Sequence, residues 1–231
     1  MMQMFLNRLL GILFPEKCIF CGEITNGGYG PCGKCESRLP FITGKLCAHC
    51  GLPSEECRCY SKNHLYVRCI APAYYIDEMQ KAVKMLKFSD FPKAAIPLAA
   101  LMAKSVNEHY AGIHFDVIAS VPMTKRAVRK RGYNQAALLA DELAKLIKVK
   151  HDPLLLYKNR ETGIQHKLSA RNRVQNVSGA FSASPRVKGK CVLLVDDIST
   201  TGETFAVCTK ALLEQGASSV YCVSAAAVIK Q

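Results

Sequence analysis

The stretch CVLLVDDISTTGET, residues 191–204, constrains the fold more than any other part of the chain. Its run of apolar residues is typical of a strand that is buried on both faces, as in a parallel sheet. Asp196 and Asp197 follow at the carboxyl end of that strand, where open α/β sheets bind their ligands. A turn of small residues then opens a helix that we expect over 203–215. The stretch therefore predicts an α/β protein with a ligand site at the end of this strand.

The turn after the acids has the composition of an anion site. Small residues at the start of a helix present backbone N–H groups and the positive end of the helix dipole, which suits a phosphate. Two carboxylates in front of the turn suit the hydroxyl groups of a sugar phosphate. Acids that merely cap the helix are the alternative, and capping accounts for one acid but not for two. The predicted phosphate cradle consists of Ser199, Thr200, Thr201, Gly202, Glu203 and Thr204.

This combination of strand, acids and Thr-Thr-Gly-x-Thr turn resembles the signature of the type I phosphoribosyltransferases. The resemblance implies a parallel sheet flanked by helices that binds phosphoribosyl pyrophosphate (PRPP). It implies that Asp196 and Asp197 form the catalytic pair, which holds the ribose hydroxyls, while the turn holds the 5-phosphate. A second loop, which ends another predicted strand and is followed by cations, would bind the pyrophosphate together with Mg²⁺. The residues implied there are Val121, Pro122, Lys125 and Arg126.

Cysteine spacing predicts a small metal-binding module in front of the sheet. The chain has twelve cysteines, and C-x2-C pairs in a chain with no expected signal peptide favour metal over disulfides. Glycines 22, 33 and 51 stand where turns between paired thiolates need a positive φ. Closed four-thiolate sites hold structural Zn²⁺. We predict two such ions, bound by Cys18, Cys21, Cys32, Cys35, Cys47, Cys50, Cys57 and Cys59. Sequential pairing of neighbouring pairs is our preference, and cross-braced pairing stays open.

Positive charge is concentrated in one block of the chain. The formal net charge is +13, and residues 123–190 hold sixteen Lys and Arg against four Asp and Glu. A charged run is often only a solvated face, but this concentration favours an anionic partner. Single-stranded DNA suits a basic groove with aromatic side chains, for which Tyr133 and a tyrosine cluster (Tyr60, Tyr66, Tyr74, Tyr75) are candidates if they are not core residues. The predicted nucleic-acid or anion contacts are Arg129, Lys130, Arg131, Arg160 and Arg173.

Two longer motifs narrow the resemblance. The pattern P-x3-R-x4-RG-[FY]-NQ covers residues 122–135, and R-x-T-x2-Q-x2-L-x4-R-x2-NV-x2-AF covers residues 160–181. Together with the cysteine pairs they are similar to the ComF/ComFC family of phosphoribosyltransferase-like proteins. The resemblance implies a role in DNA uptake and natural transformation, with PRPP, single-stranded DNA and competence proteins as partners. Two functions stay open: a phosphoribosyltransferase, or a DNA-binding adaptor whose PRPP pocket is a sensor or relic.

These observations predict a two-part organisation. Residues 1–63 would form a short leading helix and a double zinc ribbon, and residues 64–231 the phosphoribosyltransferase-like domain. We expect helices near 78–88, 92–109, 134–148 and 203–215, and strands near 115–121, 152–157, 190–196 and 218–228. The polar stretch 158–180, which includes His166, is typical either of a disordered segment or of a functional lid over the site. Because no segment is apolar enough to cross a membrane, we expect a cytoplasmic protein.

Overall fold

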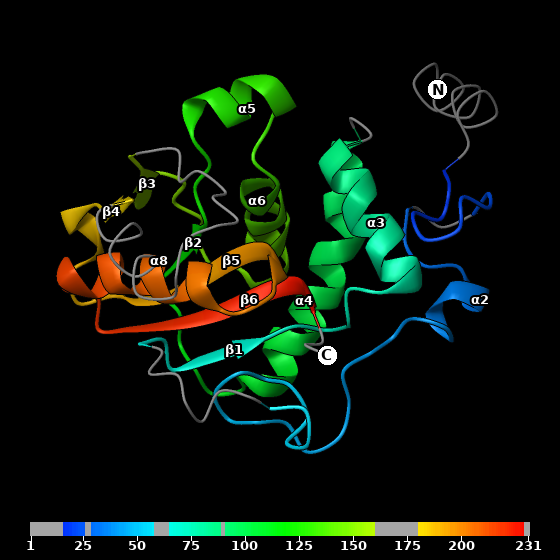
Figure 1. Ribbon diagram of the computed structural model, residues 1–231, viewed down its shortest axis with the longest axis horizontal. Helices are drawn as coiled ribbons and strands as arrows, with labels where there is room; N and C mark the ends of the chain where they lie inside the picture. The colour runs from blue at the N-terminus through cyan, green and yellow to red at the C-terminus, as the bar shows by residue number, and fades with distance from the viewer. Residues whose placement is uncertain (1–15, 26–28, 58–64, 89–90, 160–179, 229–231) are drawn as a thin grey trace, which may run out of the picture.

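The main sheet is parallel throughout (Figure 1). The computed structural model describes residues 16–25, 29–57, 65–88, 91–159 and 180–228. The sheet has four strands in the order β1-β6-β5-β2, which span Arg68–Ile70 (β1), Val117–Ser120 (β2), Cys191–Ser199 (β5) and Ser219–Ala227 (β6). The longest ladder joins β5 to β6 and runs from the pair Cys191 and Ser219 to the pair Ser199 and Ala227. The predicted parallel α/β fold is confirmed.

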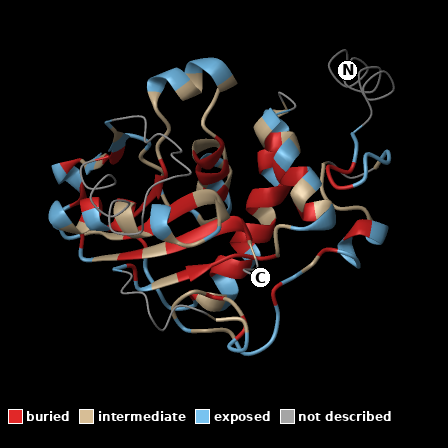
Figure 2. Cartoon of the chain, viewed as in Figure 1, coloured by how far each residue is buried: buried red, intermediate tan, exposed pale blue. Residues whose placement is uncertain are grey.

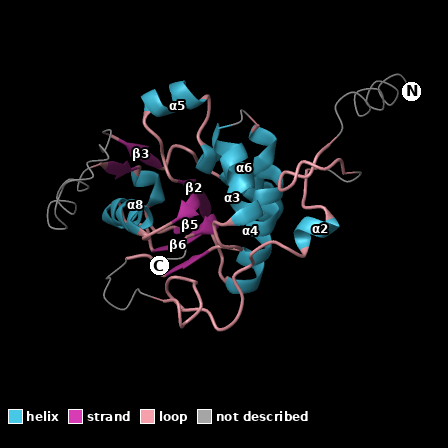
Figure 3. Cartoon of the chain, turned by 45° about the vertical axis from the view of Figure 1, so that its right-hand side comes forward, coloured by secondary structure: helices cyan, strands magenta, loops and turns pink. Residues whose placement is uncertain are grey.

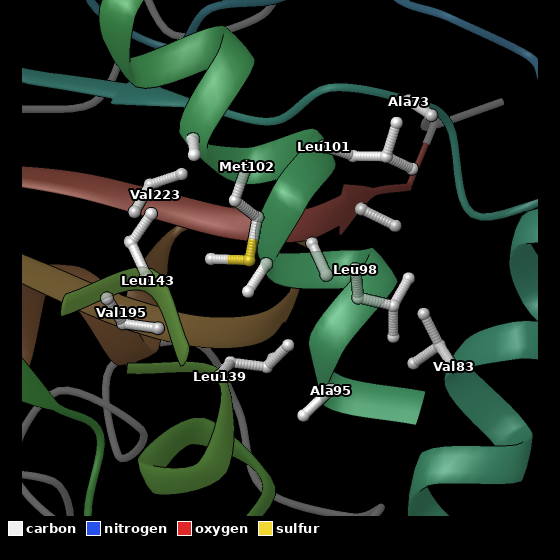
Figure 4. Close-up of a cluster of buried hydrophobic side chains, with 14 of the residues drawn as sticks. Ala73, Val83, Ala95, Leu98, Leu101, Met102, Leu139, Leu143, Val195 and Val223 are labelled. Atoms are coloured by element: carbon white, nitrogen blue, oxygen red, sulfur yellow. The ribbon is translucent and has the colours of Figure 1, made fainter. Parts of the chain in front are cut away.

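Both faces of the central strand β5 are covered by helices (Figure 3). Leu193 and Val195 pack into one apolar cluster, and Val192 and Leu194 into another on the opposite face. The first cluster is shared with α3 (Asp77–Phe88), α4 (Ala95–His109) and α6 (Gln135–Ile147), as Figure 4 shows around Met102. The second is shared with α8 (Glu203–Glu214). Double coverage explains why the β5 sequence is continuously apolar rather than alternating.

The helices lie close to where the sequence predicts them. The predicted 92–109 helix divides into a 3-10 turn, η1 (Pro92–Ala94), and α4. A short helix of the main domain is unexpected: the cations after β2 form α5 (Lys125–Arg131) instead of a loop. Thr124 caps α5 by accepting a hydrogen bond on its Oγ1 from the Ala127 N–H at 3.2 Å. Gly132 ends it at a φ of 87°, where a residue without a Cβ is favoured.

Two strand predictions need correction, and one strand was missed. The strand expected at 152–157 does not join the main sheet; β3 (Leu156–Lys158) pairs antiparallel with β4 (Phe181–Ala183), which precedes a 3-10 turn, η2 (Pro185–Val187). Beside β2 the chain makes only a bridge at His151, because it turns at Pro153 and Leu154, and the Leu154 N–H donates to the Asp152 Oδ1 at 3.0 Å instead of to β2. The short strand β1 was not predicted. The strand β5 continues past the acids to Ser199 instead of ending at Asp196.

The cysteine-rich segment packs against the main domain at two places. Ile19 and Phe20 are buried in the same cluster as α3 and α4, and Figure 1 shows the short helix α2 (Gly33–Glu36) on that side. Further along, the His49 carbonyl accepts a hydrogen bond from the Cys69 N–H of β1 at 2.8 Å. The His49 ring stacks on Tyr66 with centroids 4.9 Å apart. Within the described ranges, no helix combines the length and apolar character needed to span a bilayer.

Candidate functional site

The two acids of β5 lie at the carboxyl end of the sheet and are largely covered. Asp197 forms an ion pair with Lys87 at the end of α3, with Oδ2 and Nζ 3.0 Å apart and side chains only 14% and 19% exposed. The Asp196 Oδ1 accepts a hydrogen bond from the Asp197 backbone N–H at 2.8 Å. The acids are therefore held in place by α3 and by their own backbone.

Asp196 differs electrostatically from an ordinary carboxyl group. Burial raises the pKa of Asp196 to about 8, and the negative charge of Asp197 adds to this effect. The Asp197 N–H, Lys87 and Lys158 act in the opposite direction. Asp196 therefore carries a proton at neutral pH in the absence of ligand. A protonated carboxyl can donate one hydrogen bond and accept another, as a sugar hydroxyl requires of its partner.

The predicted phosphate cradle connects β5 to α8. Ser199 is the last residue of β5, and Gly202 precedes the first turn of α8 at a φ of 75°. The Thr201 Oγ1 accepts a hydrogen bond from the Glu203 N–H at 3.3 Å. The first-turn residues Glu203 and Thr204 are exposed. This arrangement leaves the start of a twelve-residue helix open toward the sheet edge, in a position to receive an anion.

The predicted pyrophosphate loop lies beside the acids because β2 and β5 are neighbours. The Val121 N–H donates to the carbonyl of Val195, the residue before Asp196, at 2.9 Å. Asn134 fixes the other side of the loop: its Nδ2 donates to the Val121 carbonyl at 3.0 Å, and its Oδ1 caps α6. Pro122 follows in the loop. The cations Lys125 and Arg126 begin α5 and are exposed.

Three of the five predicted nucleic-acid or anion contacts lie within the described residues. Arg129, Lys130 and Arg131 lie on the second half of α5, which Figure 2 shows as exposed to intermediate along its length. These three residues line a cavity of about 670 Å³. The other lining residues are Lys87, Phe88, Met123, Ala127, Gly132 and Tyr133. Arg160, Arg173 and the lid around His166 fall outside the described residues.

Sequence reasoning missed Lys87 and Phe88, at the end of α3. Lys87 contacts Asp197 from a distance of more than a hundred residues along the chain, and no local pattern in MLKFSD indicates that contact. Phe88 is 72% exposed although it is a large apolar residue. The predicted tyrosine cluster also needs revision, because Tyr66 is a buried core residue. Tyr60 lies outside the described residues.

The cysteines form two clusters in the order that sequential pairing predicts. The sulfurs of Cys18, Cys21, Cys32 and Cys35 all lie within 4.8 Å of one another, as do those of Cys47, Cys50 and Cys57. Cys59 lies outside the described residues. Gly22 and Gly51 have the expected positive φ, but Gly33 does not and begins α2 instead. The prediction for Gly33 was wrong because the second pair of the first cluster sits on a helical turn.

The first cluster has the chemistry of a tetrahedral zinc site. Burial would raise the pKa of Cys18, but the N–H groups of Cys32, Cys21 and Phe20 lower it to about 7. Burial raises the pKa of Cys35, and its neighbouring thiols raise it further. Four sulfurs this close cannot all ionise without a cation between them, and a bound Zn²⁺ removes that repulsion. The residues therefore fit the ion.

Comparison with known proteins agrees with both parts of the chain. The family described as Double zinc ribbon domain matches residues 9–69, and the family described as Phosphoribosyl transferase domain matches residues 87–231. DNA utilization protein YhgH of Escherichia coli K12 is 33% identical over 215 residues, which cover 89% of this chain and 94% of that protein.

Two further relatives are named for competence. Competence protein ComFC of Bacillus subtilis is 28% identical over 195 residues, covering 80% of this chain and 78% of that protein. Competence protein F of Haemophilus influenzae is 26% identical over 220 residues, covering 90% and 95%. With the paired cysteines, the parallel sheet and the acids of β5, these matches show that the chain belongs to the ComF/ComFC family of double-zinc-ribbon, phosphoribosyltransferase-domain proteins.

Proposed function

We propose that the chain binds PRPP at the carboxyl edge of the sheet. Asp196 and Asp197 would hold the ribose hydroxyls, and the turn from Ser199 to Thr204 would hold the 5-phosphate. The loop at Val121 and Pro122, with Lys125 and Arg126, would bind the pyrophosphate. The observation that carries this proposal is the hydrogen bond of 2.9 Å between Val121 and Val195, because it brings the loop beside the acids.

The same residues suit transfer of the ribosyl phosphate to an acceptor. Pyrophosphate leaves as positive charge develops on the ribose, so catalysis needs cations at the leaving group and acids near the ring. The exposed α5 supplies the cations, and β5 supplies the acids. Mg²⁺, bound with PRPP, would neutralise charge on the pyrophosphate oxygens. Most of the rate enhancement would then come from positioning and electrostatics.

We also propose that single-stranded DNA binds the basic face of α5, and that the protein acts in DNA uptake in the cytoplasm. The names of the relatives, DNA utilization protein and competence protein, support this role. The alternative is a non-catalytic adaptor that binds DNA and uses the PRPP pocket as a sensor. The exposed Phe88 beside the cations of α5 favours DNA contact in either case.

Pyrophosphate release separates the enzyme from the adaptor. PRPP and Mg²⁺ are incubated with the full-length protein, with and without nucleobases or oligonucleotides, and pyrophosphate is measured. Release that requires an acceptor identifies a transferase. PRPP binding in calorimetry, without release for any acceptor, identifies the adaptor. A wild-type protein that does not bind PRPP contradicts both readings of the site.

We further propose that each cysteine cluster holds one structural Zn²⁺, with Cys59 completing the second. Elemental analysis of protein purified without added metal should give two zinc ions per chain. Cys18→Ser should lower that ratio to one and destabilise the first ribbon, since so small a module depends on its metal. The control is Cys191→Ser, a half-buried cysteine of β5 outside both clusters, which should keep two ions. A zinc ratio near zero in the wild type would refute the proposal.

A further inference from the structure

The cavity between the end of α3 and α5 has a lining that the PRPP site does not account for. Four of its nine lining residues are cations, two are aromatic, and none is acidic. Its volume of about 670 Å³ falls within the range of small-ligand pockets, a size that admits a nucleotide. A pyrophosphate would be satisfied by the cations alone and gives no reason for aromatic rings in the wall.

The two aromatic rings are fixed by their neighbours. Tyr133 donates a hydrogen bond from its hydroxyl to the Leu86 carbonyl at 2.9 Å, which ties the residue after α5 to the last turn of α3. Phe88 is 72% exposed, and the Arg131 guanidinium lies over its ring at 5.5 Å from the centroid. Arg131 is held in turn by the buried Gln135, whose Oε1 accepts from Nη1 at 2.8 Å. Phe88 is therefore an exposed, oriented ring within a basic wall.

We propose that this cavity binds one nucleotide of single-stranded DNA, with its base stacked on Phe88 and its phosphates on Arg129 and Lys130. Every base has a π-face, so aromatic stacking combined with phosphate contacts binds single strands without sequence preference. The proposal rests on the proposed function, since it assumes that the basic face of α5 binds DNA. It adds that bases as well as phosphates are recognised, and it names the residue that recognises them.

The cavity also adjoins the acids of β5. Lys87 lines the cavity and pairs with Asp197 at 3.0 Å, so one side chain belongs to both sites. A nucleotide in the cavity and the ribose of PRPP would therefore both be neighbours of Lys87. The bound strand would lie next to PRPP, where a transferase needs its acceptor.

An abasic oligonucleotide tests the base contact separately from the phosphate contacts. Binding of fluorescent oligothymidylate and of an abasic strand with the same number of phosphates is measured by anisotropy, using the full-length protein. Wild type should bind oligothymidylate roughly ten-fold more tightly, as expected for stacking of a base on one aromatic ring. Phe88→Leu keeps an apolar side chain at an exposed position and should abolish the difference. The matched control is Tyr157→Leu, an exposed aromatic residue of β3 outside the cavity, which should keep it.

The outcomes distinguish this proposal from the function on which it rests. A preference for oligothymidylate that survives in Phe88→Leu overturns the base site, and so does its absence in the wild type. If DNA still binds with a steep salt dependence in that case, the proposed basic DNA surface stands. If no DNA binds at low salt, both are overturned. Thermal melting of each variant excludes misfolding as the cause of any loss.

Discussion

The acids of β5 and the cations of α5 lie near one another but are built in opposite ways. Asp196 pairs with Ser224 in the ladder between the central strands β5 and β6, and Asp197 is held by Lys87 in a partly buried ion pair. The helix α5 has no buried residue and is joined to the domain by loops at both ends (Figure 1). One region is pre-organised within the core, whereas the other is a charged surface.

The two regions therefore suit different ligands. Buried charge is expensive, so the protein keeps one acid protonated and pairs the other, and a ligand must supply compensating interactions. Exposed cations cost little and interact with any polyanion in a salt-dependent way. We therefore expect substitutions in β5 to alter both stability and a specific ligand, and substitutions of Arg129 and Lys130 in the second half of α5 to alter DNA binding alone.

The largest expected effect on the surface side follows from removing three cations of α5. Arg129→Ala, Lys130→Ala and Arg131→Ala together should flatten the log–log salt dependence of single-strand binding by about two units, since each phosphate contact contributes about 0.7. Thermal stability should fall slightly, by about 1 kcal/mol, because Arg131→Ala removes the hydrogen bond to the buried Gln135. The control triple variant, Lys145→Ala, Lys150→Ala and Lys210→Ala, removes the same charge from exposed sites elsewhere. An equal loss of slope in the control would assign DNA binding to overall charge instead of to α5.

A smaller effect is expected from the proton on Asp196. Its pKa is about 8 in the folded protein and near 3.8 when unfolded, so the folded state binds the extra proton between these values. Its contribution to the free energy of unfolding therefore falls as pH rises from about 4 to 8, by at most about 1.4 kcal/mol per pH unit. Asparagine cannot ionise, so the free energy of unfolding of Asp196→Asn should rise relative to that of the wild type as pH rises from about 4 to 8. Denaturant melts of both proteins at several pH values measure the difference, and a constant difference would contradict the raised pKa.

The smallest effect should come from Lys87. Its charge lowers the pKa of Asp196, so Lys87→Met should move the Asp196 titration to higher pH, by about one unit or less. Carboxyl chemical shifts followed by NMR report this directly. Lys84→Met, an exposed lysine one turn earlier in α3 that bonds to Gln80, is the matched control and should leave the titration unchanged. A shift of the same size in both variants would mean that Lys87 acts only through net charge.

The sequence predicts those features that a local pattern encodes. The apolar run before Asp196, the glycine at 202 and the paired cysteines each have one dominant physical reading, and the structure has a buried strand, a helix start and two thiol clusters there. The helices were predictable because their apolar faces recur at helical spacing. The expectation of a positive φ at Gly33 was wrong because the second C-x2-C pair was treated as the same kind of turn as the first.

Features that depend on distant contacts could not be predicted. The strand β1 is three residues long and is defined by its pairing with β6 at Tyr221 to Val223. The departure of the chain from the sheet after His151 depends on Pro153 and on where β4 lies. The contact between Lys87 and Asp197 joins elements 110 positions apart, so only the packing of α3 on the sheet reveals it.

If β5 holds PRPP while a separate surface holds DNA, one pair of titrations should separate the two ligands. PRPP with Mg²⁺, and separately single-stranded DNA, are titrated by calorimetry into wild type and the double variant Asp196→Asn, Asp197→Asn above pH 8. Glu142→Gln with Glu214→Gln, two acids in ion pairs away from the site, is the control for charge. We predict that the double variant loses PRPP affinity by about 100-fold or more, since two charge-assisted hydrogen bonds are worth at least about 3 kcal/mol. DNA affinity should be unchanged or slightly higher. PRPP binding that is equal in wild type and the double variant would contradict the account.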